Sequence, residues 1–277
     1  MEHLEGIIQR GPGQDLYYQR WRPDQDAKAV LAIVHGFGEH SSRYANVVDV
    51  LVPAGYAVYS FDNRGHGKSF GKRGHISNWE DFRTDVFAFL QLVREKEPDK
   101  PLFLMGHSLG GLIALEFLLR LPDGIDGAVI SGPALTQGAV SPILLLIGKL
   151  ISYVIPSFTL DSKLEANDIS RDPRVVMDYK KDPMVHSLAS ARFGAEMGSA
   201  IKWVRKHAGD LKTPILIIHG GDDRLVDPKC SREFFEKITI DDKKRIEYDG
   251  YFHETHNDLN WEKPVSDILE WLDKRVG

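Results

Sequence analysis

The chain has 277 residues, of which 42% are hydrophobic and 27% are charged, as expected of a globular protein with one large domain or a domain with an insertion. Its 40 acidic and 35 basic side chains give a net charge of −5, so it lacks the basic excess that nucleic-acid binding needs, and we expect no nucleic-acid partner. The single cysteine, Cys230, excludes an internal disulfide and a cysteine metal cluster, and the N-terminal residues show no signal-peptide pattern, so we expect a cytoplasmic protein.

Strand and helix patterns alternate along most of the chain. Two short strands around a Gly-Pro-Gly turn come first, and six further strands are predicted within residues 29–36, 57–67, 101–108, 126–134, 213–223 and 244–250. Helices are predicted between and after them, at residues 42–55, 79–98, 109–122, 231–238 and 264–276. Continuous apolar strands that alternate with helices indicate an α/β fold with a mostly parallel central sheet flanked by helices.

Residues 135–212 interrupt this alternation, because they show helical patterns and no strand pattern. The segment is too long for a structureless loop, so we predict a helical cap, or lid, on a core made of residues 1–134 and 213–277. The longest apolar run of the chain, residues 142–158, falls in this cap and is shorter than the roughly 20 residues that span a bilayer. Two interpretations stay open for this run: a buried helix, or an exposed apolar helix that makes peripheral membrane contact beside a lipid-binding mouth.

The sequence GHSLGG, residues 106–111, matches the pattern G-x-S-x-G. It lies between an apolar strand and an amphipathic helix, which is the setting in which this pattern forms a sharp turn around a nucleophilic serine. Small neighbours are needed because the turn is strained, and the helix N-terminus favours developing negative charge. The pattern predicts Ser108 as a nucleophile, against the alternative of an ordinary strand-to-helix turn.

An activated serine needs a base, and the base needs an acid that orients it. In this architecture the acid follows a late strand and the histidine comes after it in the chain. The stretch HGGDDRLVDP supplies the acid, and we predict Asp223, four residues after His219. Of the neighbouring aspartates, Asp222 is assigned to the turn and Asp227 to a helix cap.

Two histidines, His253 and His256, follow the last predicted strand in the stretch FHETH. His253 comes first on the loop at the carboxyl ends of the strands, so it is the predicted base. His256 is either a residue at the rim that contacts substrate or a plain surface histidine. We expect no metal site here, because zinc motifs of the H-E-x-x-H type need a spacing of four and no third ligand is indicated.

The loop HGFGEH, residues 35–40, is predicted to form half of an oxyanion hole. Its Phe37 would offer one backbone N–H, and Leu109, directly after the nucleophile, would offer the other. A plain glycine loop is the alternative. The later stretch DNRGHGKS resembles a phosphate-binding P-loop only in part, because Asp62 stands where the first glycine is required, so we expect no nucleotide site.

Taken together, HGFGEHSSRY, DNRGHGKS, GHSLGG, HGGDDRLVD and FHETH resemble the motifs of the α/β-hydrolase superfamily and, within it, of the monoglyceride lipase and lysophospholipase family. The resemblance runs from Ala29 to the C-terminus and is looser in the cap. It implies an α/β-hydrolase fold, no cofactor, a triad of Ser108, Asp223 and His253, and oxyanion donors at Phe37 and Leu109. It also implies a small alcohol pocket, for which the matching residues are Glu39, Arg43, Tyr179 and His256.

The resemblance further implies a lipid ester substrate held in a tunnel under the cap. The expected activity is hydrolysis of monoacylglycerols to free fatty acid and glycerol through an acyl-enzyme. A lysophospholipase or a broad carboxylesterase with the same triad is the alternative, and haloperoxidases and C–C bond hydrolases share the triad too. Ser108 excludes an epoxide hydrolase or dehalogenase, which carries aspartate at that position, and the filled triad argues against a non-catalytic binding protein.

Overall fold

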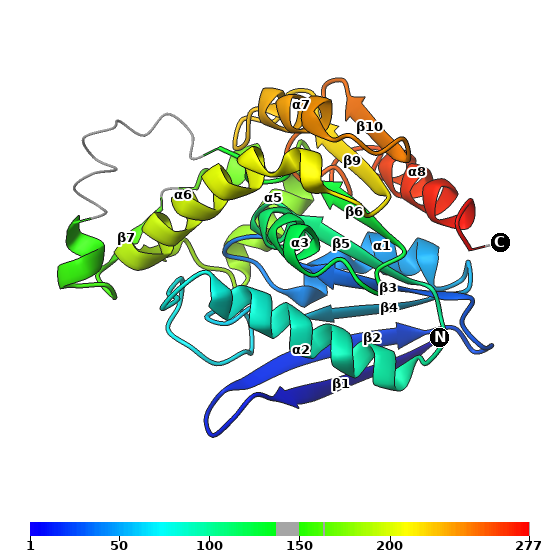
Figure 1. The fold of residues 1–277 in the computed structure, drawn as a ribbon, viewed down its shortest axis with the longest axis horizontal. Coiled ribbons are helices and arrows are strands. Elements are labelled where there is room, and N and C mark those ends of the chain that lie inside the picture. Colours follow the sequence, from blue (N-terminus) through cyan, green and yellow to red (C-terminus); the bar gives the residue numbers. More distant parts are fainter. Residues whose placement is uncertain (137–149, 163, 277) are drawn as a thin grey trace.

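The computed structural model describes residues 1–136, 150–162 and 164–276. Its centre is an eight-stranded sheet with the strand order β1-β2-β4-β3-β5-β6-β9-β10 (Figure 1). The strands from β4 to β10 in this order run parallel, and β1 and β2 add an antiparallel hairpin at one edge. The bounds are β1 (Glu2–Gln9), β2 (Asp15–Arg22), β3 (Ala29–Val34), β4 (Tyr56–Phe61), β5 (Leu102–His107), β6 (Gly127–Ser131), β9 (Ile215–Gly220) and β10 (Lys243–Tyr248).

The inner strands of the sheet are buried along their whole length. Every residue of β3, β4, β5, β6 and β9 is buried, as their continuous apolar sequences predict. The edge strand β10 is only partly buried, which explains its weaker pattern. All six predicted core strands and the N-terminal hairpin are confirmed, and with them the α/β fold class.

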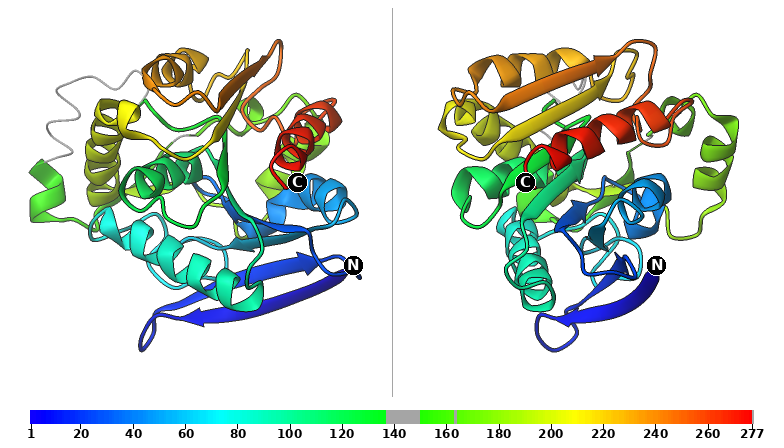
Figure 2. Two further views of the ribbon diagram at one scale, coloured as in Figure 1. Left: turned by 45° about the vertical axis from the view of Figure 1, so that its right-hand side comes forward. Right: turned by 90° about the vertical axis from the view of Figure 1, so that its right-hand side faces the viewer.

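Helices cover both faces of the sheet (Figure 2). One face packs against α1 (Ala45–Leu51), which follows a short 3-10 turn at Ser41–Tyr44, and α8 (Glu262–Asp273). The other packs against α2 (Glu80–Lys96), α3 (Leu109–Arg120) and α7 (Pro228–Lys237), and α6 (Ala191–Lys206) lies against α3. Helix α3 is buried continuously from Leu109 to Leu118, so the start of this helix is held rigidly in the core.

The segment between β6 and β9 differs in part from the prediction. It contains the helices α5 (Pro173–Lys181) and α6, as expected, with 3-10 turns at Ala166–Asp168 and Ala208–Asp210. It also contains two short strands, β7 (Thr159–Asp161) and β8 (Leu188–Ser190), which pair antiparallel. The prediction of no strand is therefore wrong, because three-residue strands are too short to show an alternating pattern.

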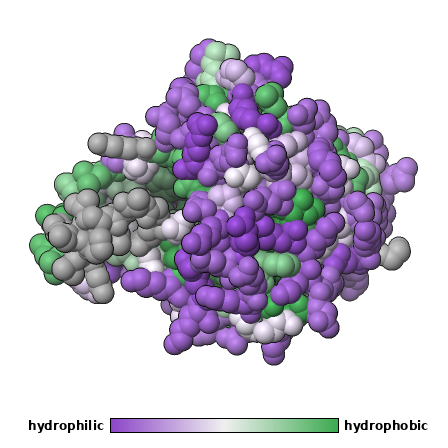
Figure 3. Space-filling model, turned by 90° about the horizontal axis from the view of Figure 1, so that it is seen from above, coloured by the Kyte–Doolittle hydropathy of each residue, from purple (hydrophilic) through white to green (hydrophobic). Residues whose placement is uncertain are grey.

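Residues 142–149 of the apolar run at residues 142–158 lie outside the described residues, and the described part, residues 150–158, is mostly exposed. The exposed fraction is 60% for Leu150, 66% for Tyr153 and 80% for Val154. Figure 3 shows apolar side chains gathered at this end of the molecule. For this part of the run, the interpretation as a buried helix is wrong. Within the described ranges, no helix is long and apolar enough to cross a bilayer.

Candidate active site

Ser108 lies on a sharp turn between β5 and α3. Its backbone has φ 52 and ψ −116, a region that non-glycine residues rarely occupy. The flanking glycines allow the close approach: a Cβ on Gly110 would lie 2.0 Å from the carbonyl oxygen of Val34, and one on Gly106 would lie 2.4 Å from that of Gly110. The G-x-S-x-G pattern thus reflects a turn in which only glycine fits on either side, with the serine at the N-terminus of α3.

Ser108 and His253 line one small cavity of about 20 Å³. The side chains of Phe37, Glu39 and Tyr179 face the same space. Leu164 and Ile169, from the segment between β6 and β9, also line it. No hydrogen bond joins Ser108 to His253 in the described part of the chain, and such bonds are often loose without substrate. A cavity of this size holds about one water molecule, so it is smaller than an ester with an acyl chain.

Asp223 and His253 are held together by a short hydrogen bond. Nδ1 of His253 lies 2.6 Å from Oδ2 of Asp223, and both side chains are buried. The other oxygen, Oδ1, accepts the backbone N–H groups of Leu225 and Val226, each at 2.9 Å. His219 adds a contact of 3.1 Å to Oδ2. The carboxylate is therefore fixed from both sides and orients the His253 ring.

The protonation of this pair follows from its surroundings. Burial alone lowers the pKa of His253, but the Asp223 carboxylate outweighs it and raises the pKa above the ordinary value. Burial raises the pKa of Asp223, yet the charges and hydrogen bonds of His253 and His219 hold it well below its usual range. Asp223 thus stays ionised and His253 is a stronger base than a free imidazole, as a proton acceptor for Ser108 requires.

The neighbouring aspartates differ from Asp223 in position. Asp222 is exposed on the turn, and its backbone N–H donates to Tyr251 O at 3.0 Å. Asp227 is the N-cap of α7, where its side chain accepts the N–H of Lys229. Neither carboxylate contacts His253, so only Asp223 has the position of an orienting acid.

The loop after β3 presents Phe37 to the cavity. Gly38 has a φ of 75, and a Cβ there would lie 2.2 Å from His186 O, so only glycine allows this tight loop. The Phe37 ring packs against His66, on the DNRGHGKS loop, with 5.8 Å between centroids. Among the described residues, neither the Phe37 nor the Leu109 N–H donates to another protein group, so both are free to bind an oxyanion.

A buried cluster of charges lies behind this loop. Arg43 donates from Nε to Glu39 at 3.2 Å and from Nη2 to both carboxylate oxygens of Glu254, at 2.6 and 2.8 Å. Glu39 also accepts the Gly36 N–H at 2.5 Å and the Tyr44 hydroxyl at 2.9 Å. Of the four alcohol-pocket candidates, the structure places Glu39 and Tyr179 at the cavity, whereas Arg43 stands behind them with its guanidinium 4.7 Å from the Tyr179 ring.

The two carboxylates that share Arg43 are not equivalent. Burial and the neighbouring Glu254 raise the pKa of Glu39. Burial also opposes ionisation of Glu254, but Arg43 holds the pKa of Glu254 below its usual value. Glu254, which lies next to His253, was not predicted from sequence, because its partner Arg43 is 211 residues away.

His256 does not lie where the sequence placed it. Its side chain is 0% exposed, stacked on Tyr44 with 4.9 Å between centroids and edge-on to His107 at 5.0 Å. Neither ring nitrogen has a hydrogen-bond partner in the described structure, and burial lowers the pKa of His256 to about 4. The expectation of a surface histidine is wrong, and His256 does not line the cavity that holds Ser108.

The reason is that the whole FHETHND loop folds inward. Residues 253–258 are all buried although all are polar. The N–H of Glu254 donates to Ile169 O at 2.8 Å, and Arg171 pairs with Asp258 at 2.9 Å. Among the described residues no group of histidine, cysteine and acidic side chains could hold a metal ion. Cys230 is a buried free thiol.

Comparison with known proteins adds to this geometry. The profile of a family described as "Serine aminopeptidase, S33" matches residues 25–260. The chain is 33% identical to a monoacylglycerol lipase of Mycolicibacterium smegmatis, over 94% of this chain and 93% of that one. It is 31% identical to the phospholipase YtpA of Bacillus subtilis, over 86% of this chain and 92% of that one. Among solved structures, a monoacylglycerol lipase of Paleococcus ferrophilus is 33% identical and superposes with a TM-score of 0.86, covering 94% of this chain and 99% of that chain.

Proposed function

Because the chain belongs to the serine aminopeptidase S33 family and is a serine ester hydrolase acting on lipid esters, we propose that it cleaves monoacylglycerols to free fatty acid and glycerol. The observation that carries the proposal is the contact of 2.6 Å between Asp223 and His253 beside a cavity that also contains Ser108. The similarity to monoacylglycerol lipases over nearly the whole chain supports the choice of substrate.

The proposed reaction uses Ser108 as the nucleophile. His253 accepts the proton of the Ser108 hydroxyl while the oxygen attacks the ester carbonyl, and Asp223 stabilises the imidazolium that forms. The oxyanion is bound by the N–H groups of Phe37, on the loop after β3, and of Leu109, at the start of α3, where the helix dipole also favours negative charge. The tetrahedral intermediate collapses to an acyl-enzyme, and His253 gives its proton to the leaving alcohol. Water then attacks the acyl-enzyme by the same route and releases the fatty acid.

The charge of the cavity favours glycerol as the leaving group. Its lining includes the acidic residues Glu39 and Glu254 and no lysine or arginine, and Arg43 pairs with both carboxylates from behind the cavity. Glycerol hydroxyls donate hydrogen bonds to such groups, whereas the phosphodiester of a lysophospholipid would bring a negative charge beside them. A lysophospholipase remains the second candidate, because a phospholipase is among the relatives at 31% identity.

A substrate panel tests this choice. We expect kcat/KM for 1-monooleoylglycerol to exceed that for 1-oleoyl-lysophosphatidylcholine, which carries the same acyl chain, and for a short p-nitrophenyl ester. An aminoacyl p-nitroanilide, included because the family is named for peptidases, should release nothing. Preference for the lysophospholipid would contradict the proposal and identify a lysophospholipase, and activity on the short ester alone would identify a general esterase.

We also propose that residues 135–212 act as a cap through which the protein contacts a membrane surface. Exposed apolar side chains gather in its described part: Leu150, Tyr153, Val154, Ile155, Phe158 and Leu160 are between 42% and 80% exposed. An exposed apolar patch of this kind is costly in water unless it meets a partner. A lipid surface fits, because it also supplies the lipid esters that the cap covers.

Liposome flotation tests this contact. We expect the wild type to float with phosphatidylcholine vesicles, and the triple variant Val154→Ser, Ile155→Ser, Leu160→Ser to stay at the bottom of the gradient. The matched control is Leu4→Ser, Ile7→Ser on the edge strand β1, which removes exposed apolar side chains far from the cap in sequence. Equal flotation of wild type and cap variant would contradict membrane contact through these residues.

A further inference from the structure

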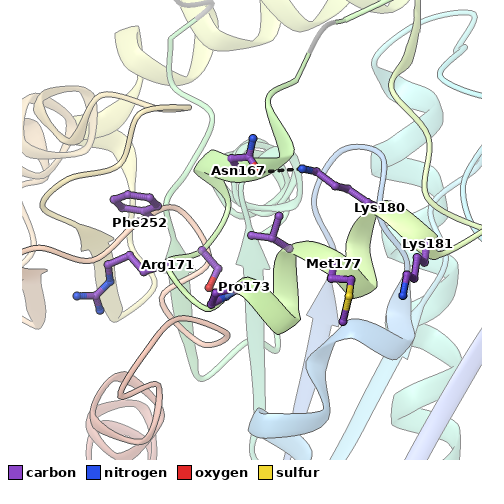
Figure 4. Close-up of a pocket in the computed structure, with 9 residues that line it drawn as sticks. Asn167, Arg171, Pro173, Met177, Lys180, Lys181 and Phe252 are labelled. Carbon is purple, nitrogen blue, oxygen red and sulfur yellow. Dashed lines mark hydrogen bonds between the residues drawn. The ribbon is translucent and has the colours of Figure 1, made fainter.

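A second hollow lies along helix α5, separate from the cavity of Ser108 (Figure 4). It is an open cleft of about 720 Å³, and small-molecule sites typically measure roughly 300–1,000 Å³. The cleft and the cavity share no lining residue, but a thin wall separates them: Ile169 and His253 line the cavity, and their chain neighbours Ser170 and Phe252 line the cleft. The cleft is therefore next to the candidate active site without being part of it.

One face of α5 forms the floor of this cleft. Pro173, Val176, Met177, Lys180 and Lys181 follow the spacing i, i+3, i+4, i+7 and i+8, which places them on one side of the helix. The buried residue of the helix, Tyr179, points instead to the cavity of Ser108. The face that lines the cleft is thus apolar along its first two turns and cationic at its end.

The cations at that end lack an anionic partner. Lys180 donates to the neutral Oδ1 of Asn167 at 2.8 Å across the cleft, as the dashed line in Figure 4 shows. Lys181 makes no ion pair with any described residue, and no acidic side chain lines the cleft. Arg171, by contrast, is neutralised by Asp258 at 2.9 Å. The cleft therefore combines an apolar floor with two uncompensated ammonium groups, which suits an anion with an apolar chain.

We propose that this cleft binds a fatty-acid anion, with its carboxylate at Lys180 and Lys181 and its chain along Met177, Val176 and Pro173 toward Phe252. Helix α5 has nine residues and is about 14 Å long, and the apolar floor from Pro173 to Met177 covers its first half. The choice of a fatty acid as the ligand rests on the proposed function. Each turnover of the proposed reaction releases a fatty acid on the other side of the wall formed by residues 169–170 and 252–253. The cleft is then a product site distinct from the site of hydrolysis.

Calorimetric titration with decanoate tests the proposal on protein whose Ser108 has been blocked with a long-chain fluorophosphonate, so that the catalytic tunnel is already filled. We expect one decanoate to bind, and Lys180→Gln, Lys181→Gln to weaken binding about tenfold, as the loss of charge-assisted hydrogen bonds predicts. The single variant Lys181→Gln, which removes no hydrogen bond or ion pair to the described residues, should show a smaller loss in the same direction. Binding of uncharged 1-decanol should not change in either variant.

The matched control is Lys202→Gln, Lys206→Gln, which removes two exposed lysines one turn apart on α6. No binding of decanoate to the blocked protein, or equal weakening by the control and the α5 variant, would overturn the proposal. Stoichiometric labelling of Ser108 is read separately by mass spectrometry. A serine that resists the reagent contradicts the proposed function, whereas the comparison of the lysine variants still decides whether the α5 cleft binds the anion.

Discussion

At the scale of single residues, Asp223 shows how one carboxylate sets the chemistry of the candidate site. Four hydrogen bonds fix its two oxygens, and the shortest, at 2.6 Å, goes to His253. Asp222 has the same side chain one position earlier but is exposed and does not reach the histidine. Substitution of Asp222 is therefore a matched control for substitution of Asp223, because both changes remove the same carboxylate charge.

We predict that Asp223→Asn lowers kcat on the order of 10³- to 10⁴-fold, because an amide neither fixes the His253 ring in its working orientation nor stabilises the imidazolium. His253 must be neutral to accept the serine proton, so the rate rises as pH increases through its pKa. The carboxylate raises this pKa, so the acid limb of the pH–rate profile should lie above the ordinary histidine value of about 6.5 and move to lower pH in Asp223→Asn. Asp222→Asn should leave kcat and the acid limb of the pH–rate profile unchanged. An equal loss of kcat in the two variants would contradict the assignment of Asp223 as the orienting acid.

Sequence motifs predicted some residues of the site well and others not at all. The turn at Ser108 could be predicted because glycine spacing and the strand-to-helix transition are local features. Glu254 and His219 were missed, since their importance lies in contacts with Arg43 and Asp223 that only the folded chain creates. His256 was misplaced because a polar loop was expected at the surface, whereas Arg43, Arg171 and backbone groups satisfy the polar groups of its neighbours Glu254 and Asp258 inside the protein.

At the scale of elements, Arg43 joins two loops that must work together. Its guanidinium connects Glu39, on the loop of the proposed oxyanion donor, with Glu254, on the loop that carries His253. The arginine side chain is 9% exposed and both carboxylates are buried. Because two buried carboxylates share one cation, the position of each loop depends on this contact.

We predict that Arg43→Met lowers the free energy of unfolding by about 3–5 kcal/mol, since it leaves two buried carboxylates facing each other without a cation. Arg43→Lys should restore only part of the loss, because an ammonium cannot reproduce the contacts that Nε and Nη2 make in two directions. Urea denaturation measures both. Arg174→Met removes an exposed ion pair with Asp172 and should change stability little. A similarly small effect of Arg43→Met would show that the cluster does not hold the loops.

The strands of the core could be predicted, because a strand that is buried on both faces has a continuous run of apolar residues in its sequence. The strands β7 and β8 could not, because each has three residues and their pairing joins positions about 30 residues apart, with Thr159 opposite Ser190. The sequence also did not determine how far the segment between β6 and β9 is buried. An apolar run fits a core helix and an exposed contact surface equally well, and only the fold places its described end in solvent.

At the scale of the whole molecule, buried histidines make stability depend on pH. Burial lowers the pKa of His35, His66, His107 and His256, to about 4 in the case of His35 and His256. The unfolded chain therefore binds more protons than the folded one below pH 6.5, so stability falls as pH falls through this range. His253 acts in the opposite sense: its raised pKa adds stability below pH 6.5 that is lost as pH rises through the folded value.

We predict that the free energy of unfolding decreases from pH 6.5 to pH 4, by up to about 1.4 kcal/mol per pH unit for each histidine that stays neutral when folded. His256→Phe should keep the stacking on Tyr44, forfeit no hydrogen bond and give a shallower pH dependence than the wild type. Denaturation curves between pH 4 and 7 measure this. Parallel curves for wild type and His256→Phe would contradict a neutral, buried His256.

Fatty-acid release from 1-monooleoylglycerol tests most directly whether Ser108 and His253 together hydrolyse a monoacylglycerol. Wild type is compared with Ser108→Ala and His253→Ala, and with the control variants Ser199→Ala on α6 and His3→Ala on β1. We predict robust release by wild type and both controls, and a loss on the order of 10⁴-fold or more in the two site variants. Undiminished release by either site variant, or no release by the wild type, would contradict the account.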